Sequence, residues 1–377
     1  MTRRRLPASI FALPFLAALH LAIGASVASA QDDPPPYVLH VYTNLIQVPT
    51  LILSKAHKPL PPVPLTNFDI SLDSGPTFHP TQMRLEGDDP ISLAILIDAS
   101  DPDNSIVRNF SLALSSLVPG FLHSQDHVTV YALDCALIRS SDDLPASAFL
   151  LRDGVELALA ATNLHGPKRH TTCANKLRLL DSVVTITNTL ASMPGRRVLL
   201  VVSNGIDTAS QTKWVNNPRY LNLAGVSVFG LRSSFASATA EDNAQFYSRH
   251  AYGAVSGSQS SYEDLFRELC EMNGGMVLST RAKDLTRNLD TFVDLLRNRY
   301  ILEFPRSNDA PSGLHNIAVT IPQKDAFITT AGVLIPLADP KLLADPNTVP
   351  TTPSQIKFGT RRPLDPNNPS QPTTPPH

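Results

Sequence analysis

The most apolar run in the middle of the sequence ends in an acidic residue and a hydroxyl residue. This run, ISLAILIDAS at residues 91–100, is short and continuous and contains Asp98 and Ser100 at its end. Such runs are typical of strands that are buried on both faces of a sheet. Ligands of open α/β sheets bind where the carboxyl ends of the strands meet. Since carboxylate and hydroxyl oxygens suit a hard cation, Asp98 and Ser100 are candidate cation ligands.

Patterns that would indicate catalysis are missing from the sequence. It has no H-E-x-x-H pair, no P-loop and no G-x-S-x-G nucleophile elbow. No pair of carboxylates suggests glycoside hydrolysis. The 11 histidines are scattered without the spacing of a metal site, and no CxxC or Cys/His pattern indicates structural zinc. We therefore expect a protein that is not an enzyme.

Strands and helices are predicted to alternate in the segment that positions Asp98. Further buried strands are indicated by DHVTVYALDCAL and RRVLLVVSNGID, and amphipathic helices by SIVRNFSLALSSLVPGFL, NKLRLLDSVVTITNTLASM and AKDLTRNLDTFVDLLRNR. Strands that alternate with helices in this way imply an α/β fold with a doubly wound, mostly parallel sheet. We expect this domain to span residues 91–303.

The three cysteines allow at most one disulfide within the chain. Cys135 ends the second predicted core strand, and Cys173 precedes the second predicted helix. Both positions fall on the same edge of a doubly wound sheet, so a disulfide between them is one interpretation and two separate thiols are the other. Cys270 shares the apolar face of a predicted helix with Leu265 and Leu269, which indicates a role in the core.

The segments that flank this core differ from it in composition. Residues 1–30 contain three arginines, an apolar run and a terminal ASA motif, the pattern of a cleaved secretory signal; an uncleaved anchor helix is the alternative. Residues 31–90 and 304–335 are predicted to be β-segments that pack together as a small β-domain or extend the sheet edge. The proline-rich tail, residues 336–377, is expected to be disordered.

These flanks predict where the protein is found. We expect an exported protein, periplasmic or extracellular after cleavage near Ala30, with no transmembrane segment in the mature chain. The 377 residues include 31 Lys and Arg against 33 Asp and Glu, a formal net charge of −2. A weakly acidic chain without a basic stripe argues against nucleic-acid binding.

Several segments, taken in order, resemble von Willebrand factor type A (VWFA) domains. The run ISLAILIDAS resembles the family's first strand, which opens a D-x-S-x-S loop, and VVSNGIDTAS resembles its strand that ends in an (S/T)-D-G loop. The segment LCEMNGGMVLS is similar to the family's helix–(T)GG–strand, and LLRNRYILEF to its closing helix and Tyr-centred strand. With NFDISLDSG in the N-terminal region, the order is similar to that of secreted bacterial VWFA-related proteins. The resemblance covers residues 38–335.

The resemblance implies a metal-ion-dependent adhesion site for Mg²⁺ or Mn²⁺. The residues at the corresponding positions are Asp98, Ser100, Thr171 or Thr172, and Asn204. The site is degenerate, because Pro102 stands in place of the second serine and Asn204 in place of an aspartate. Asp101, Asp103 and Ser105 are close enough along the chain to substitute. The two losses favour the interpretation that these carboxylates cap helices and hold loops, rather than bind a cation.

The resemblance also implies a function. We expect an exported, non-enzymatic protein-binding or adhesion module that uses the loops at the carboxyl edge of the sheet. Its partner would be a protein or a component of the cell envelope, and Mg²⁺ or Mn²⁺ is the cofactor that the family suggests. The alternative is a structural or scaffolding envelope protein in which these loops are inert.

Overall fold

The computed structural model describes seven stretches of the chain. These stretches are residues 45–100, 104–141, 143–163, 176–213, 216–233, 264–305 and 312–335. The predicted signal at residues 1–30 and the predicted tail at residues 336–377 lie outside them.

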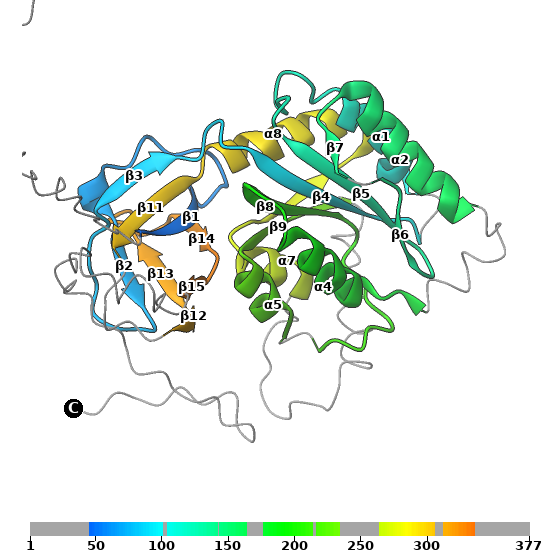
Figure 1. Cartoon of the computed structure of the whole chain (residues 1–377). Helices are drawn as coiled ribbons and strands as arrows, with labels where there is room; N and C mark the ends of the chain where they lie inside the picture. The colour runs from blue at the N-terminus through cyan, green and yellow to red at the C-terminus, as the bar shows by residue number, and fades with distance from the viewer. Residues whose placement is uncertain are drawn as a thin grey trace, which may run out of the picture. The chain divides into compact units, whose positions relative to one another are not determined.

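A seven-stranded sheet organises the middle of the chain (Figure 1). Its order is β10-β9-β8-β4-β5-β6, with β7 beside β5. The strands are β4 (Ile91–Asp98), β5 (His127–Leu133), β6 (Leu137–Arg139), β7 (Leu144–Pro145), β8 (Arg196–Val202), β9 (Val226–Ser233) and β10 (Val277–Thr280). Five are parallel, while β6 and β7 run antiparallel to β5. Every residue of β4 is buried, which explains its continuous apolar sequence.

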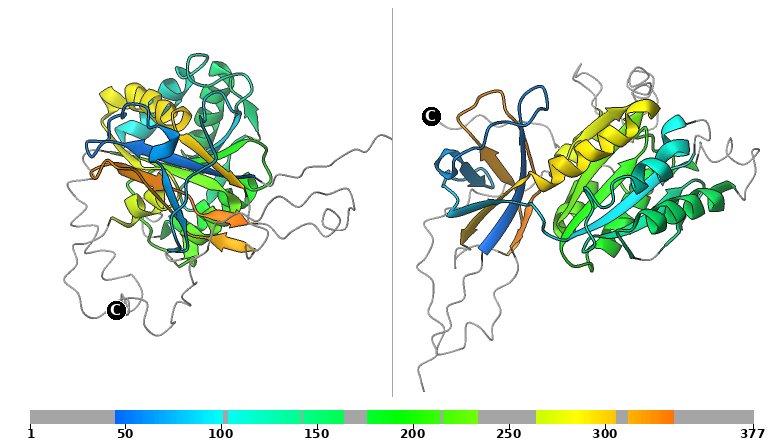
Figure 2. Two further views of the ribbon diagram at one scale, coloured as in Figure 1. Left: turned by 90° about the vertical axis from the view of Figure 1, so that its left-hand side faces the viewer. Right: turned by 90° about the horizontal axis from the view of Figure 1, so that it is seen from above.

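Helices cover both faces of this sheet (Figures 1 and 2). One face carries α1 (Ser105–Ser115), α2 (Ala148–Asn163) and α8 (Leu285–Arg297); the other carries α4 (Leu179–Leu190), α5 (Asn217–Ala224) and α7 (Leu265–Glu271). Alternate residues of β4 serve the two cores: Leu93, Ile95 and Ile97 pack with the first set of helices, and Ala94 and Leu96 with the second. The predicted doubly wound α/β fold is confirmed.

The remaining strands form smaller sheets. A four-stranded sheet has the order β14-β1-β11-β3, and two further pairs are β12-β15 and β13-β2. The bounds are β1 (Leu45–Leu53), β2 (Asp69–Leu72), β3 (Gln82–Leu85), β11 (Tyr300–Pro305), β12 (Gly313–His315), β13 (Ile317–Thr320), β14 (Phe327–Thr330) and β15 (Val333–Ile335). Two short 3₁₀ helices are η1 (Leu65–Asn67) and η4 (Ala282–Asp284).

The two terminal β-segments pair with each other in these sheets. Strand β1 is antiparallel to β14, and β2 is antiparallel to β13. Of the two arrangements that the sequence left open, the segments therefore pack together. The strand after α8 also belongs here, because β11 pairs with β1 and β3. The domain boundary expected at residue 303 falls inside β11, since this strand completes the small sheet rather than the large one.

Candidate functional site

Asp98 ends β4 at the centre of the large sheet. Its strand lies between β5 and β8, and the register places Asp98 opposite Leu133 and Ile97 opposite Val202. Numbered along the chain with the short β7 left out, the strands of the large sheet have the order 3-2-1-4-5-6, in which β4 is the first. The chain changes direction across the sheet between β4 and β8, and ligands of doubly wound folds bind at such a switch point.

Two serines hold the Asp98 carboxylate. Ser100 donates to Oδ1 from its backbone nitrogen at 3.0 Å and from its hydroxyl at 2.6 Å. Ser203, directly after β8, donates its hydroxyl to Oδ2 at 2.7 Å. Asp98 is only 7 % exposed, so its carboxylate oxygens need these donors in place of water. The carboxylate joins the ends of β4 and β8, and we call Asp98, Ser100, Ser203 and Asn204 the rim.

The loop after β8 is shaped by a close contact at Gly205. This glycine donates its backbone N–H to the Ser203 hydroxyl at 3.0 Å and has a φ of +82°. A Cβ at this position would lie 2.6 Å from Cβ of Phe266, so only glycine fits. The neighbouring Asn204 keeps its buried Oδ1 without a hydrogen-bond partner among the described residues. A buried acceptor of this kind is unusual in proteins.

The structure brings together only some of the residues that the sequence singled out. Asp98 and Ser100 are hydrogen-bonded, and Asn204 lies in the adjoining loop. The residues outside the described ranges are Asp101, Pro102, Asp103, Thr171, Thr172 and Cys173. Sequence reasoning missed Ser203 as a partner of Asp98, although its hydroxyl stands in the VVSNGID segment that was compared with the (S/T)-D-G loop.

Asp207 forms hydrogen bonds within the loop after β8 and to α4. Its Oδ1 accepts the hydroxyl of Ser210 at 2.6 Å and the N–H of Leu180, in α4, at 3.4 Å. Burial raises the pKa of Asp207, and these hydrogen bonds offset part of the rise. Asp181 ties the same loop to α4 by accepting the backbone N–H groups of Gln211 and Thr212. The loop after β8 is thus fixed to the helix beside it.

A second charged pair stands at the carboxyl end of β9. Arg232 is 6 % exposed and donates two hydrogen bonds to Asp264, which also caps the N-terminus of α7. Burial alone would raise the pKa of Asp264, but the hydrogen bonds and charge of Arg232 lower it below its usual value. The Arg232 guanidinium lies 5.2 Å from the ring centroid of Phe266. Phe266 is also the residue that leaves no room for a Cβ at Gly205.

The described cysteines differ in state. Cys135 is disulfide-bonded, while Cys270 is a free thiol that belongs to α7 and is fully buried in the core. Burial raises the pKa of Cys270 well above its ordinary value, so this thiol is unreactive. Because Cys173 lies outside the described ranges, its pairing with Cys135 stays a prediction.

The rim has some of the features of a divalent-cation site. Its donors are all oxygen, which suits Mg²⁺ or Mn²⁺ in kind. Both carboxylate oxygens of Asp98 already accept serine hydroxyls, however, and Asn204 adds no charge. Among the described residues, no group of three or more His, Cys, Asp and Glu side chains could hold a metal. The described rim does not fit a firmly bound cation.

Comparisons with known proteins find likenesses in structure alone. No family model matches the sequence, and no curated protein matches it. The chain is similar to proximal thread matrix protein 1 from the mussel byssus, whose structure has a zinc-occupied MIDAS motif. The identity is 12 %, the TM-score 0.39, and the match covers 56 % of this chain and 49 % of that one. The chain thus spans about half the length of this matrix protein.

Two bacterial proteins give similar matches. One is the vWF domain of the type V pili tip protein Mfa5 from Porphyromonas gingivalis, at 7 % identity and a TM-score of 0.36, over 55 % of this chain and 94 % of that one. The other is the pilus adhesin SpaC from Lactobacillus rhamnosus GG, at 7 % identity and a TM-score of 0.38, over 72 % and 48 %. By its own strand order and helices, the large sheet forms a doubly wound α/β fold.

Proposed function

We propose that this chain is an exported, non-enzymatic protein-binding module that engages its partner through the rim. The observation that carries the proposal is the cluster at the switch point, where Asp98 organises the hydroxyls of Ser100 and Ser203. The loop after β8 is tied down by Asp207, Asp181 and Gly205, so this part of the rim is preorganised. Preorganisation favours binding because little conformational freedom is lost when the partner arrives.

The rim works without a cation in this proposal. Serine hydroxyls and a backbone N–H satisfy Asp98, so the carboxylate needs no metal to remain buried. The neutral Asn204 removes a charge that would otherwise offset the dehydration of Mg²⁺. Recognition then rests on shape and on hydrogen bonds from the loops after β4 and β8.

A substitution in the rim should abolish partner binding. We expect Ser100→Arg to reduce the capture of the partner from a cell-envelope extract of the source organism by at least tenfold, because a long charged side chain would cover the switch point. The matched control is Ser116→Arg, which places the same side chain on an exposed residue after α1, at the opposite edge of the sheet. Capture is measured by quantitative mass spectrometry, after thermal unfolding has shown that both variants fold.

The same experiment addresses the structural alternative. The replacement of a carboxylate by Asn204 favours an inert rim, in which case the chain would be a scaffolding protein of the envelope. Equal capture by the wild type, Ser100→Arg and Ser116→Arg would support this alternative and reject the rim as the binding surface. Loss in Ser100→Arg alone would support the proposal.

Metal should not stabilise the wild-type protein. We expect the same melting temperature in EDTA and in roughly 10 mM Mg²⁺ or Mn²⁺, because a cation raises the melting temperature only when the folded protein binds it. This concentration would fill a site of millimolar affinity. Asn204→Asp, which restores the missing carboxylate, should introduce a metal-dependent rise. A rise in the wild type that disappears in Asp98→Ala would overturn the metal-independent proposal.

Export is part of the proposal and rests on the sequence of residues 1–30. Within the stretches that the structure describes, none of the helices has the length and apolar character needed to span a bilayer. The disulfide of Cys135 accords with an oxidising compartment, where such bonds persist. We propose that cleavage follows Ala30 and that the partner is a protein of the envelope or the cell exterior.

A further inference from the structure

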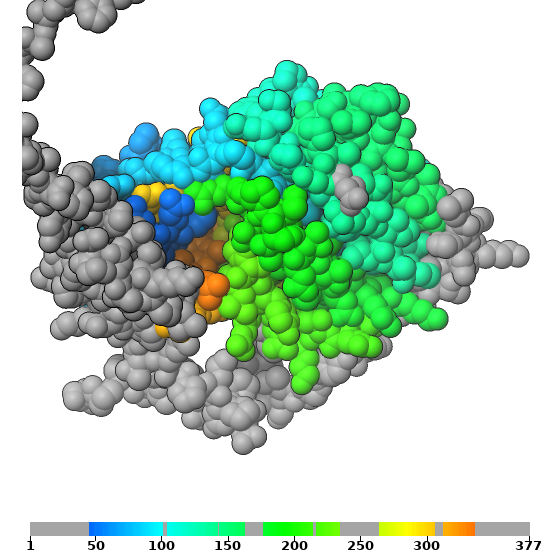
Figure 3. Space-filling view, in the orientation of Figure 1, coloured from blue at the N-terminus to red at the C-terminus, as the bar shows by residue number. Residues whose placement is uncertain are grey.

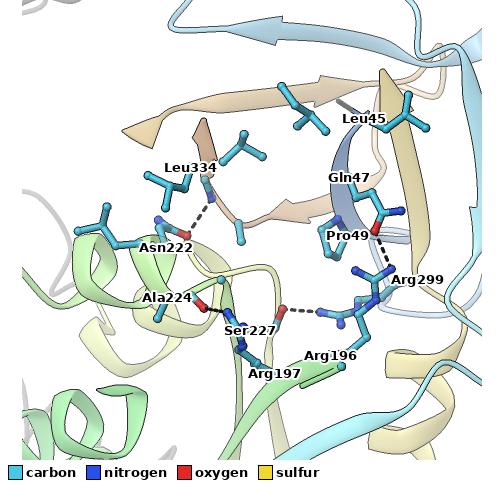
Figure 4. Close-up of a pocket in the computed structure, with 17 residues that line it drawn as sticks. Leu45, Gln47, Pro49, Arg196, Arg197, Asn222, Ala224, Ser227, Arg299 and Leu334 are labelled. Carbon is cyan, nitrogen blue, oxygen red and sulfur yellow. Dashed lines mark hydrogen bonds between the residues drawn. The ribbon is translucent and has the colours of Figure 1, made fainter. Parts of the chain in front are cut away.

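A cavity of about 440 Å³ opens at the edge of the large sheet opposite the rim. Its floor comes from the first residues of β8 and β9 and from the end of α5, and its other walls come from β1 and β15. In Figure 3, green, blue and orange residues border this hollow, and Figure 4 shows its side chains. The volume falls within the range of small-molecule sites, about 300–1,000 Å³.

One part of the cavity is apolar and unusually exposed. Leu45, Leu223 and Leu334 line it and are 41 %, 39 % and 45 % exposed. They lie far apart in the sequence, yet they gather at one opening with Pro49 and Val333. Apolar side chains that are grouped at a cavity and left open to solvent mark a binding surface more often than scattered ones do.

The other part of the cavity carries three arginines, of which two are neutralised. Arg299 makes two hydrogen bonds to the Glu86 carboxylate, at 2.7 and 2.9 Å. Arg196 pairs with Asp89 at 3.1 Å. Asp89 also accepts a hydrogen bond from Arg84 at 2.7 Å, and Arg84 lies 3.7 Å from Glu303. The three carboxylates thus balance Arg84, Arg196 and Arg299, so neither cavity arginine supplies a net positive charge to a ligand.

Arg197 is different, because its hydrogen bonds go to neutral groups. Its Nε donates to the carbonyl of Met193 at 3.0 Å and its Nη1 to that of Ala224 at 2.9 Å. Within the described stretches, no carboxylate lies within 4.0 Å of it, and its Nη2 donates to no residue. The two carbonyls hold the guanidinium in place, and one positive charge remains beside the apolar wall.

Asn222 offers a second donor next to this charge. Its Oδ1 accepts the backbone N–H of Gly332 at 2.8 Å, which fixes the orientation of the amide (Figure 4). Its Nδ2 makes no hydrogen bond within the described stretches. Arg197 and Asn222 both line the cavity, so each offers a donor to the carboxylate of a ligand.

We propose that this cavity binds a linear aliphatic carboxylate of medium chain length. The carboxylate pairs with Arg197 and Asn222, and the hydrocarbon chain covers Leu45, Leu223 and Leu334. A single uncompensated guanidinium matches a singly charged anion, whereas a phosphate of nearly twice that charge would leave part of its charge unpaired. The site is independent of the rim, since it lies at the amino edge of the parallel strands.

Isothermal titration of the full-length protein with sodium decanoate, below its micelle-forming concentration, tests this proposal. We expect binding of one decanoate per chain, with an affinity in the micromolar to millimolar range. Decan-1-ol, which has the same chain without the charge, should bind at least about tenfold more weakly, because its neutral hydroxyl cannot form an ion pair with Arg197.

Three variants locate the site. Arg197→Gln should weaken decanoate binding about tenfold or more. Leu223→Ser should also weaken it, because the variant loses part of the apolar wall while the guanidinium stays unchanged. Arg219→Gln, on an exposed residue of the same helix α5, should leave it unchanged. No binding of decanoate at millimolar concentration would overturn the proposal, as would equal binding by the wild type and Leu223→Ser. Equal affinity for decanol and decanoate would reject the role of Arg197.

Discussion

Replacing Arg299 with methionine is expected to lower the free energy of unfolding by about 3–5 kcal/mol. Arg299 and Glu86 are each about 1 % exposed, and two hydrogen bonds join their charged groups. Arg299 also donates to the hydroxyl of Ser227, in β9, at 2.6 Å. Removing the guanidinium leaves a buried carboxylate without its principal partner, which costs far more than the loss of an exposed ion pair. Urea denaturation of the purified protein measures the difference.

Two further variants separate this effect from the loss of packing. Glu86→Leu combined with Arg299→Met removes both charges, and we expect it to recover most of the lost stability, because Glu86 no longer leaves an unpaired buried carboxylate. Arg152→Met breaks the exposed i,i+4 pair with Glu156 and should produce no measurable change. A double variant as unstable as Arg299→Met would contradict the electrostatic explanation and point to packing instead.

This ion pair matters for the cavity. Glu86 lies between β3 and β4, Arg299 lies between α8 and β11, and Ser227 belongs to the large sheet. The pair therefore ties the strands of the small sheets to the start of β9, where the cavity lies. Nothing in the sequence indicated it, because Glu86 and Arg299 are separated by 213 residues.

The elements that were predicted well have strong local signals. Strands β4 and β8 are continuous apolar runs since each lies in the middle of a parallel sheet. Helix α8 buries Leu285, Leu289, Phe292 and Leu296 at helical spacing, so its period was plain in the sequence. The pairing of the two terminal β-segments was one of two arrangements that these signals allowed.

Helix α2 was missed, and its surface explains why. Its buried residues Leu151, Val155 and Ala158 follow helical spacing, but Phe149 and Leu157 are 69 % and 61 % exposed. Apolar residues on both faces obscure the period from which an amphipathic helix is recognised. The predicted alternation of strands and helices therefore lacks helix α2.

How far the candidate sites can be predicted depends on how far apart their residues lie in the sequence. Asp98 and Ser100 could be identified because Asp98 ends a strand with a strong apolar signal and Ser100 follows it by two residues. Their contact with Ser203 crosses 105 residues and required the register of β4 and β8. The cavity combines Leu45, Arg197 and Leu334, which no local pattern connects.

Replacing Gly275 with alanine is expected to lower the free energy of unfolding by about 3 kcal/mol or more. A Cβ at this position would lie 1.9 Å from the carbonyl oxygen of Val228 and 2.7 Å from its carbonyl carbon. Both are backbone atoms of β9, so no side-chain rotation can relieve the contact. Thermal and urea unfolding of the variant measure the loss.

A matched glycine in the same chain controls for the change in backbone entropy. A Cβ at Gly120 would meet no atom within 4 Å, so Gly120→Ala should change stability by no more than about 0.5 kcal/mol. Similar losses in both variants would show that the close approach to β9 is not the cause. A large loss in Gly275→Ala alone would show that the turn between α7 and β10 must rest directly on β9. The same turn sets the position of α7, whose capping residue Asp264 holds Arg232 at the carboxyl end of β9. The glycine pair that resembles the family's helix–(T)GG–strand would then be required by packing, whether or not the rim binds a partner.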